Sequence, residues 1–292
     1  MKYFVIFLLL LNTCFAQKIV VKDESGNLLA NVSIFLVEKD NSLIGITNNE
    51  GFSEISLNKN ASYLFHLLGF EDVKLPYSAI NSMREIVLKS ALNELEDVVV
   101  AYAKSNILKI KNTPADRFWS YPNFSNAALN KVIQIKVDSA GFLNKLTFPI
   151  KVQDKSNVSD YRFVLFKDDN GKPGKALINE SIVGNMDKKK LQFDLKSLNF
   201  YLEKGSYFFG FEALTPANFI KREGEQFKKG KWVTVPLVII NSLDTAKTYI
   251  RHNLGEWLVE TEFKFENGKR TTQLSKGRFL AYELEMLTAV AK

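Results

Sequence analysis

The sequence predicts an all-β protein built from two β-sandwich domains. Aromatic residues make up 12% of the 292 residues, and 23 of them are Phe, mostly within short runs that also hold Val, Ile, Thr and Tyr. These residue types favour strands over helices. Within the runs, apolar and polar residues alternate, and turn-forming Gly, Asn and Asp recur between them. This is the pattern of short strands that each bury one face.

The length and composition set the expected organisation. The chain is long enough for two domains of ordinary size, and a hydrophobic fraction of 46% can fill their cores. We expect a signal peptide at residues 1–16, a small prealbumin-like sandwich at 17–103, a linker at 104–130 and a larger second sandwich at 131–292. The number of strand-like runs in the last region favours a jelly-roll-like arrangement.

The first residues have the features of a secretory signal peptide. Lys2 provides a basic start, residues 3–11 are continuously apolar, and Cys14 and Ala16 are small residues suited to cleavage after Ala16. The apolar run is too short to cross a bilayer, and no other run approaches the roughly 18 residues needed. We therefore expect an exported protein, periplasmic, associated with the outer membrane or secreted, with no transmembrane span.

A lipoprotein is the alternative reading of the same segment. Cys14 would then be the lipidated first residue, with Leu11 at a suitable position but Asn12 and Thr13 fitting poorly between them. We favour plain cleavage. Cys14 is the one cysteine of the chain, so the exported body has no disulfide and depends on its hydrophobic cores for stability.

Residues 45–55 are the best-marked stretch of the first domain. Asn48 and Asn49 suit a tight turn, Gly51 can adopt positive φ at no steric cost, and Phe52 and Ile55 resume an apolar face. Around this stretch we expect further strands, which together form a small antiparallel sandwich. Their ranges are 18–22, 32–37, 43–47, 62–68, 83–88 and 96–100.

The same residues carry a resemblance to a known family. They are Val21-Lys22-Asp23 with Gly26, Asn31-Val32-Ser33-Ile34, Gly45-Ile46-Thr47-Asn48, Gly51-Phe52 and Leu68-Gly69-Phe70. Residues 17–103 thereby resemble the carboxypeptidase-like regulatory domain, a seven-stranded prealbumin-like sandwich of cell-envelope proteins in Bacteroidetes-type bacteria. Ile46 and Asn48 depart from the family's usual Thr and frequent Asp. The resemblance implies an accessory or interaction module without catalytic residues of its own.

Two features stand out after the first domain. The linker holds Pro114 and Pro122, which favour breaks and extended backbone, and the aromatic run 118–121, which either packs on a neighbouring domain or forms a binding platform. In the second domain, Pro149 interrupts an alternating run and indicates an edge strand or a bulge. Residues 161–166 are apolar on both faces, as in a central strand.

The charge pattern does not point to nucleic acid. The net charge of +7 is spread along the chain, and its densest run, Lys188–Lys190, follows Asp187. Phosphate recognition needs basic residues gathered on one face, whereas dispersed lysines keep a surface solvated. We expect no nucleic-acid partner.

The sequence offers no catalytic constellation. His66 and His252 are the only histidines, too few for zinc, and there is no serine-nucleophile elbow or phosphate-binding glycine loop. The loop 168–174 lacks the acid spacing of a calcium loop and fits a polar turn. A pair of carboxylates for sugar hydrolysis remains an alternative, because several glutamates lie on or near predicted strands. These are Glu256, Glu260, Glu262, Glu283 and Glu285.

We therefore expect a protein that is not an enzyme, with no catalytic, cofactor-binding or metal residues. The leading hypothesis is a non-catalytic envelope or secreted adaptor whose partner is another envelope protein or a surface glycan. The alternative is a carbohydrate-binding or glycan-processing protein that stacks sugars on aromatic side chains of the second domain and its linker. These are Trp119, Trp232, Trp257 and Tyr249. An accessory subunit of a peptidase complex is a third possibility.

Overall fold

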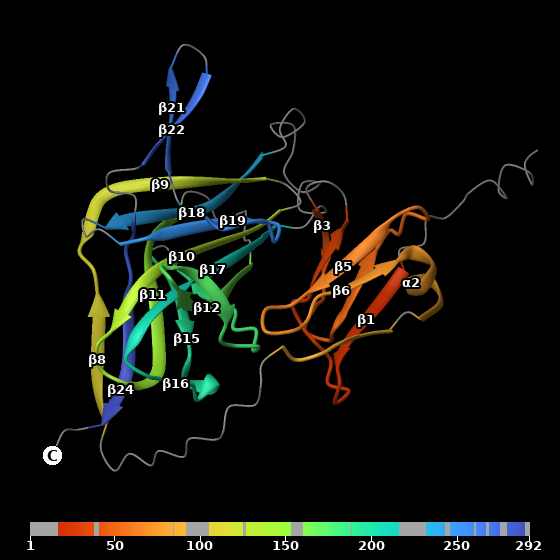
Figure 1. Ribbon diagram of the computed structural model, residues 1–292, viewed down its shortest axis with the longest axis horizontal. Coiled ribbons are helices and arrows are strands. Elements are labelled where there is room, and N and C mark those ends of the chain that lie inside the picture. Colours follow the sequence, from red (N-terminus) through yellow and green to blue (C-terminus); the bar gives the residue numbers. More distant parts are fainter. Residues whose placement is uncertain are drawn as a thin grey trace, which may run out of the picture. The chain divides into compact units, whose positions relative to one another are not determined.

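The computed structural model describes most of the chain (Figure 1). The described residues are 17–37, 41–83, 85–91, 105–124, 127–152, 160–187, 189–215, 232–242, 246–259, 261–266, 269–274 and 279–289. The predicted signal peptide and the expected strand at 96–100 lie outside them. Contacts divide the chain into two units, one reaching Leu67 and resuming over Glu71–Lys89, the other holding Leu68–Phe70 and Ser90–Lys292.

Strands dominate both units. In the described residues they are accompanied by one α-helix, α2 (Tyr77–Met83), and one 3-10 turn, η1 (Lys196–Leu198). The prediction of an all-β fold with sandwich-like domains is confirmed. Within the same residues, no helix is long and apolar enough to cross a membrane.

The first unit consists of two sheets. One has the order β4-β1-β7 and the other the order β3-β2-β5-β6. Their bounds are β1 (Gln17–Asp23), β2 (Ser33–Leu36), β3 (Ser42–Ile46), β4 (Phe52–Ile55), β5 (Ser62–His66), β6 (Val73–Pro76) and β7 (Glu85–Leu88). A Cβ atom on Gly45 of β3 would lie 2.5 Å from Ile55 Cγ2 of β4. The absence of a side chain at Gly45 therefore allows the two sheets to approach closely.

The stretch best marked in the sequence forms the turn from β3 to β4. Asn48 Oδ1 accepts hydrogen bonds from the backbone N–H groups of Glu50, at 3.0 Å, and Phe52, at 3.2 Å. Gly51 has a φ of 69°, which a residue without Cβ adopts freely. A Cβ there would also lie 2.8 Å from Leu28 Cβ. Both the conformation and the space favour Gly at this position.

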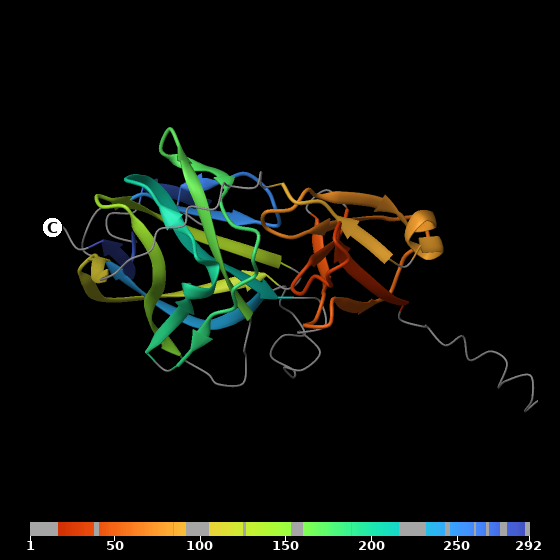
Figure 2. The same cartoon turned by 90° about the horizontal axis from the view of Figure 1, so that it is seen from below.

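Two details of the first unit differ from the sequence-based expectation. The expected strand at 83–88 begins only at Glu85, because Met83 ends α2, which lies at one end of the unit (Figure 1, Figure 2). Ile80 is the only buried residue of this helix, so its apolar periodicity is too weak to be recognised. In addition, β7 runs parallel to β1, so the sandwich is not purely antiparallel.

The second unit is built mainly from a six-stranded and a nine-stranded sheet. The six-stranded sheet has the order β13 (Lys172–Ala176), β12 (Asp160–Asp169), β17 (Gly205–Thr215), β10 (Ala127–Val137), β19 (Thr248–His252) and β20 (Leu258–Val259). The nine-stranded sheet comprises β14 (Asn185–Met186), β15 (Lys190–Asp194), β11 (Gly141–Val152), β18 (Trp232–Ser242) and β23 (Phe279–Leu280), with β8 (Ser105–Lys111), β9 (Pro114–Phe124), β16 (Tyr201–Leu202) and β24 (Glu283–Ala289). A hairpin of β21 (Thr261–Glu266) and β22 (Lys269–Leu274) is separate from both (Figure 1).

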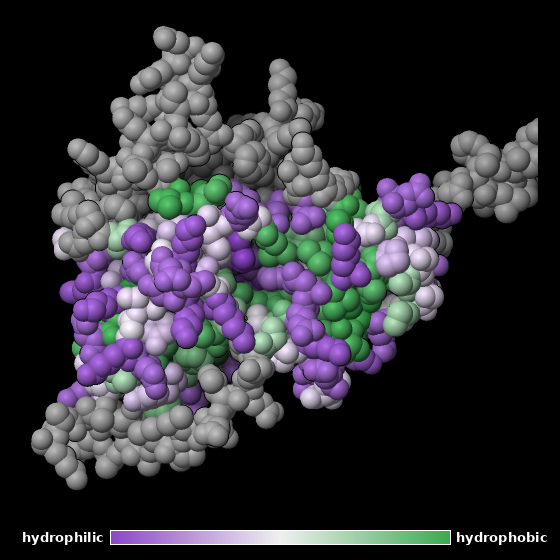
Figure 3. All heavy atoms as spheres, in the orientation of Figure 1, coloured by the Kyte–Doolittle hydropathy of each residue, from purple (hydrophilic) through white to green (hydrophobic). Residues whose placement is uncertain are grey.

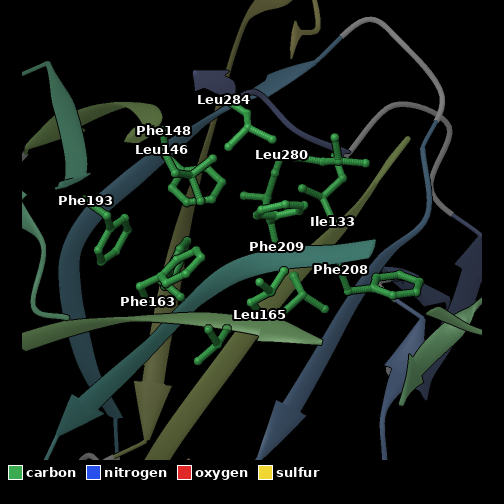
Figure 4. Packing of buried hydrophobic residues seen from close by; sticks show 14 of the residues in the cluster. Ile133, Leu146, Phe148, Phe163, Leu165, Phe193, Phe208, Phe209, Leu280 and Leu284 are labelled. Carbon is green, nitrogen blue, oxygen red and sulfur yellow. The ribbon is translucent and has the colours of Figure 1, made fainter. Parts of the chain in front are cut away.

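Aromatic side chains of the two sheets fill the core of this unit (Figure 4). Phe148 of β11 contacts Phe211 of β17 edge to face, with ring centroids 5.5 Å apart. Phe163 of β12 and Phe193 of β15 also meet across the interior, with ring centroids 5.8 Å apart and the ring planes tilted by 46°. Edge-to-face contacts suit the charge distribution of aromatic rings. Many of the Phe residues noted in the sequence therefore pack between the two sheets.

In the described part of the expected linker at 104–130, most residues form strands. There β8 pairs with β24 and β9 pairs with β18. Pro114 is the first residue of β9, and Pro122 pairs with Thr234 beside an irregularity in the register. Proline lacks an N–H, and strands tolerate it at such positions. The prolines that indicated a break therefore lie within a sheet.

Pro149 is also accommodated in an unexpected way. Strand β11 is not an edge strand: it pairs with β15 on one side, and with β24 and then β18 on the other. The N–H of Ile150 donates to Lys189 O on the β15 side, so the nitrogen of Pro149 faces the other side. On that side, β11 pairs with β24 only up to Thr147, and its pairing with β18 begins at Ile150. Pro149, which has no N–H to donate, therefore lies between the segments of β11 that pair with β24 and with β18.

The expected central strand is present. Residues Tyr161 to Phe166 belong to β12, which lies between β13 and β17, and all six are buried. Burial on both faces explains why this run does not alternate. A run that is apolar on both faces, with Arg162 as its one charged residue, was the correct signal for this strand.

Candidate interaction surface

Glu283 and Glu285, two of the carboxylates considered for sugar hydrolysis, belong to an ion-pair ladder on β24. Lys109 Nζ lies 3.1 Å from Glu283 Oε1 and 2.9 Å from Glu285 Oε1, and Lys145 Nζ lies 3.0 Å from Glu285 Oε2. Burial raises the pKa of Glu285, but hydrogen bonds from Lys109 and Lys145 outweigh it and leave the pKa below its ordinary value. Glu285 therefore stays ionised and is unsuited to act as an acid at neutral pH.

The other glutamates add no paired site. Glu256 is exposed in the segment before β20. Glu260 and the side chain of Glu262 lie outside the described residues. No acid–base pair for glycoside hydrolysis is assembled from the glutamates that can be placed.

The two histidines lie in different units and in different surroundings. His66 Nδ1 on β5 lies 2.6 Å from Asp72 Oδ1, and His66 is directly opposite Ser33 of β2. This order resembles a serine–histidine–aspartate arrangement, but Ser33 is 0% exposed, so no substrate reaches its hydroxyl. His252 ends β19, and burial lowers its pKa. The contacts around His66 therefore belong to the packing of this unit.

The loop after β12 is a hydrogen-bonded turn. Asp168 Oδ1 accepts a bond from the Gly171 N–H at 2.6 Å, and Asp168 Oδ2 accepts one from Gln134 Nε2 at 2.5 Å. The Tyr249 hydroxyl donates to Gly171 O at 2.9 Å. Across the described part of the chain, no group of three or more His, Cys, Asp or Glu residues is placed to hold a metal ion.

The aromatic residues considered for sugar stacking differ in exposure. Tyr249 is buried, with its ring against Phe208, so it offers no stacking surface. Trp257 is half-buried: its indole and the ring of Phe166 form a T-shaped pair, and the Arg251 guanidinium lies 4.5 Å from the Trp257 ring centroid. The side chains of Trp119 and Trp232 lie outside the described residues.

The clearest candidate surface lies on the first unit. We call it the outer sheet face: the side of the sheet β4-β1-β7 that points away from the second sheet of that unit. In β1, Ile19 and Val21 are buried, so the alternate residues point outward. The outward residues of the three strands, with the neighbouring Leu28, form the face. They are Lys18, Val20, Lys22, Leu28, Phe52, Glu54, Glu85 and Val87.

Several of these residues are apolar, although they point to solvent. Leu28 is 54% exposed and Val87 is 42% exposed, and they flank Lys22 on its two sides. In the next row, Val20 lies opposite Phe52 and both are half-buried. Figure 3 shows hydrophobic residues (green) on the visible face of the first unit, in the region where Figure 1 labels β1 and β6.

The charged residues of this face lie over the apolar ones. Lys18 Nζ lies 3.8 Å from the ring centroid of Phe52, and Lys22 Nζ lies 2.6 Å from Glu85 Oε2. Lysine stems cover apolar surface while their heads remain hydrated. The ring of Phe52 therefore lies beneath the ammonium group of Lys18. Sequence analysis missed this face, although Val20 and Val87 occupy positions where alternation calls for polar residues.

The comparisons with known proteins assign no family. No family model matches the chain, and no curated protein matches it. Solved chains from the Gx and Gt strains of infectious bursal disease virus are 12% and 10% identical, cover 91% and 94% of this chain, and have TM-scores of 0.27. The major pilin subunit of Bacillus cereus is 12% identical, with 93% of this chain and 84% of the pilin chain covered and a TM-score of 0.20. This chain spans 59% of the length of the viral chains, and these values carry no functional argument.

Proposed function

We propose that the protein is a non-catalytic interaction or adaptor protein of the bacterial cell envelope or the secreted fraction. Its first unit would act as a carboxypeptidase-regulatory-like module. The observation that supports this most is the outer sheet face, where exposed Leu28 and Val87 stand beside Val20 and Phe52. The signal-peptide pattern at residues 1–16 supports export.

The chemistry of the outer sheet face suits a protein partner. Fully burying a Val, Leu or Phe side chain is worth about 1.5–3 kcal/mol, so two exposed apolar residues can stabilise a complex appreciably. Lys22 and Glu85 already pair with each other, so each charge keeps its partner when another protein covers this surface. The carboxylates considered for catalysis or for calcium binding are engaged elsewhere: Glu285 with two lysines and Asp168 in a turn.

A capture experiment tests this proposal. The exported protein is immobilised and exposed to an envelope extract, in parallel with a Leu28→Glu/Val87→Glu variant. Met83→Glu serves as the matched control, because Met83 is 62% exposed on α2 and is not one of the residues that form the outer sheet face. We expect the captured partner to be lost with the double variant and retained with the control.

Two results would contradict the proposal. One is an identical set of captured proteins for all three forms. The other is turnover of a substrate on a broad hydrolase panel that disappears when Glu285 or His252 is replaced. Retention of a native far-UV spectrum by the double variant ensures that lost capture reflects the surface and not unfolding.

Glycan binding is the second candidate, and Trp257 is the observation that favours it. This side chain keeps part of its surface exposed, and the neighbouring Arg251 supplies hydrogen-bond donors beside its ring. A glycan array tests it: a bound glycan should be lost with Trp257→Ala and retained with Leu258→Ala, since Leu258 is the exposed next residue. Absence of glycan binding by the unchanged protein would eliminate this candidate.

A further inference from the structure

We propose that the mature chain begins with Gln17 and that this residue cyclises to pyroglutamate. The inference rests on the proposed export and on cleavage after Ala16. It goes beyond them by assigning a covalent modification to the first residue of the first strand. Neither the exported location nor the adaptor function requires it.

Gln17 lies at the start of the first strand of the fold. It is the first residue of β1 and lies opposite Ile55 of β4, so the chain preceding it is not needed for that pairing. Gln17 is half-buried, and its side-chain Nε2 donates a 2.9 Å hydrogen bond to Asn81 Oδ1 of α2. Its Oε1 is buried and accepts no hydrogen bond. The side-chain amide of Gln17 is therefore held by a hydrogen bond at Nε2 only.

The reaction needs no partner molecule. The α-amino nitrogen attacks the side-chain carbon Cδ, a bond forms between these atoms, and a five-membered ring closes. The Cδ–Nε2 bond breaks, a proton passes from the attacking nitrogen to Nε2, and ammonia leaves. No atom is oxidised or reduced. Because both reacting groups belong to one residue, the reaction has the advantage of an intramolecular process.

Asn81 opposes the reaction without preventing it. The leaving nitrogen must give up its bond to Asn81 Oδ1, and a hydrogen bond of ordinary net strength slows a reaction by about five-fold. Because ammonia is lost, this delay cannot reverse the outcome. The acceptor on Asn81 keeps a second donor nearby, since the Tyr77 hydroxyl lies 3.4 Å from Oδ1.

The product would alter the start of the sheet. A free terminus carries a positive charge beside Lys18, and the lactam removes that charge. It also removes the primary amine that aminopeptidases recognise. Since β1 is the middle strand between β4 and β7, trimming from its first residue would shorten the strand that holds this sheet together.

Mass spectrometry of the N-terminal peptide tests the inference. The full chain is expressed with its own leader in an envelope-forming host, and the exported protein is cleaved after acidic residues, which releases residues 17–23. We expect this peptide to be lighter than its linear form by one ammonia. A linear peptide beginning at Gln17 would overturn the inference but leave export intact. A chain beginning at Met1, at lipidated Cys14 or elsewhere would overturn the proposed cleavage and the inference together.

The role of Asn81 is tested separately by measuring the rate at which Gln17 cyclises. A removable fusion that exposes Gln17 on the folded protein starts the reaction at a known time. Cyclisation should be about five-fold faster in Asn81→Ala than in the unchanged protein. Ser82→Ala is the control, because Ser82 Oγ donates to Ala79 O on the same helix. An unchanged or slower rate in Asn81→Ala contradicts the position assigned to Asn81.

Discussion

Arg162 and Glu212 form an ion pair in which each side chain is only 1% exposed. They face each other across β12 and β17, and Asn130 Nδ2 of β10 donates to Glu212 Oε1 at 3.0 Å. Buried charges are tolerated when they are paired and hydrogen-bonded, as here. The six-stranded sheet therefore contains a polar row across three adjacent strands.

Breaking this pair should destabilise the second unit strongly. Arg162→Met leaves the carboxylate of Glu212 buried without its cation, and removing one partner of a buried pair costs about 3–5 kcal/mol. Urea unfolding is the measurement. The exposed Lys22–Glu85 pair is the control, where Lys22→Met should cost no more than about 1 kcal/mol. Equal effects of the two substitutions would contradict the burial described.

Gly45 should not tolerate a side chain. A Cβ atom at this position would lie 2.5 Å from Ile55 Cγ2 and 2.9 Å from Ser53 Oγ. Overpacking of this kind costs about 1–3 kcal/mol, so Gly45→Ala should lower the unfolding midpoint of the first unit. Gly205→Ala is the control, because the nearest atom to its Cβ would be 3.4 Å away. Calorimetry that shows no difference between them would argue against the close approach of β3 and β4.

Two buried hydroxyls should respond in opposite ways to removal. Ser33 Oγ is buried without a hydrogen-bond partner, so Ser33→Ala removes an unsatisfied polar group and should leave stability unchanged or raised by up to about 1 kcal/mol. Thr47 Oγ1 donates to Leu29 O at 2.7 Å and accepts from the Val32 N–H at 2.8 Å. Thr47→Val should cost about 1–3 kcal/mol. Urea unfolding of both variants is the measurement, and a loss in Ser33→Ala would show that Ser33 has a partner.

The Glu285 ladder predicts a dependence of stability on pH. Its folded pKa is depressed below the ordinary value of 4.5, so its contribution is present above that value and is lost as the pH falls through the folded pKa. In Glu285→Gln this contribution disappears. The difference in unfolding free energy between the two forms should therefore be largest near neutral pH and shrink in acid. A difference that grows in acid would reverse the sign of the proposed interaction.

Local sequence patterns predicted the elements whose signals lie within a few residues. The turn at Asn48 and Gly51 depends on neighbouring residues, and the buried strand from Tyr161 to Phe166 depends on one short run that is apolar except for Arg162. These were read correctly because the physical cause is local. The all-β class followed for the same reason, since composition and alternation repeat along the whole chain.

Features that depend on residues far apart in the sequence could not be predicted from local patterns. Pro114 and Pro122 suggested a linker because their strand, β9, is stabilised by β18, whose residues lie more than a hundred positions later. Pro149 suggested an edge strand or a bulge because nothing local indicates that pairing with β24 ends and pairing with β18 begins beside it. The outer sheet face was missed because exposure of Val87 depends on which strands surround β7.

The pairing of β8 with β24 links residues 105–111 to residues 283–289 within one sheet. A contact between segments so far apart in sequence forms slowly and late. During synthesis, β8 has no place in this sheet until the ribosome has produced β24, so most of the second unit is made before this sheet can close. The topology therefore postpones closure of this sheet until residues 283–289 have been made.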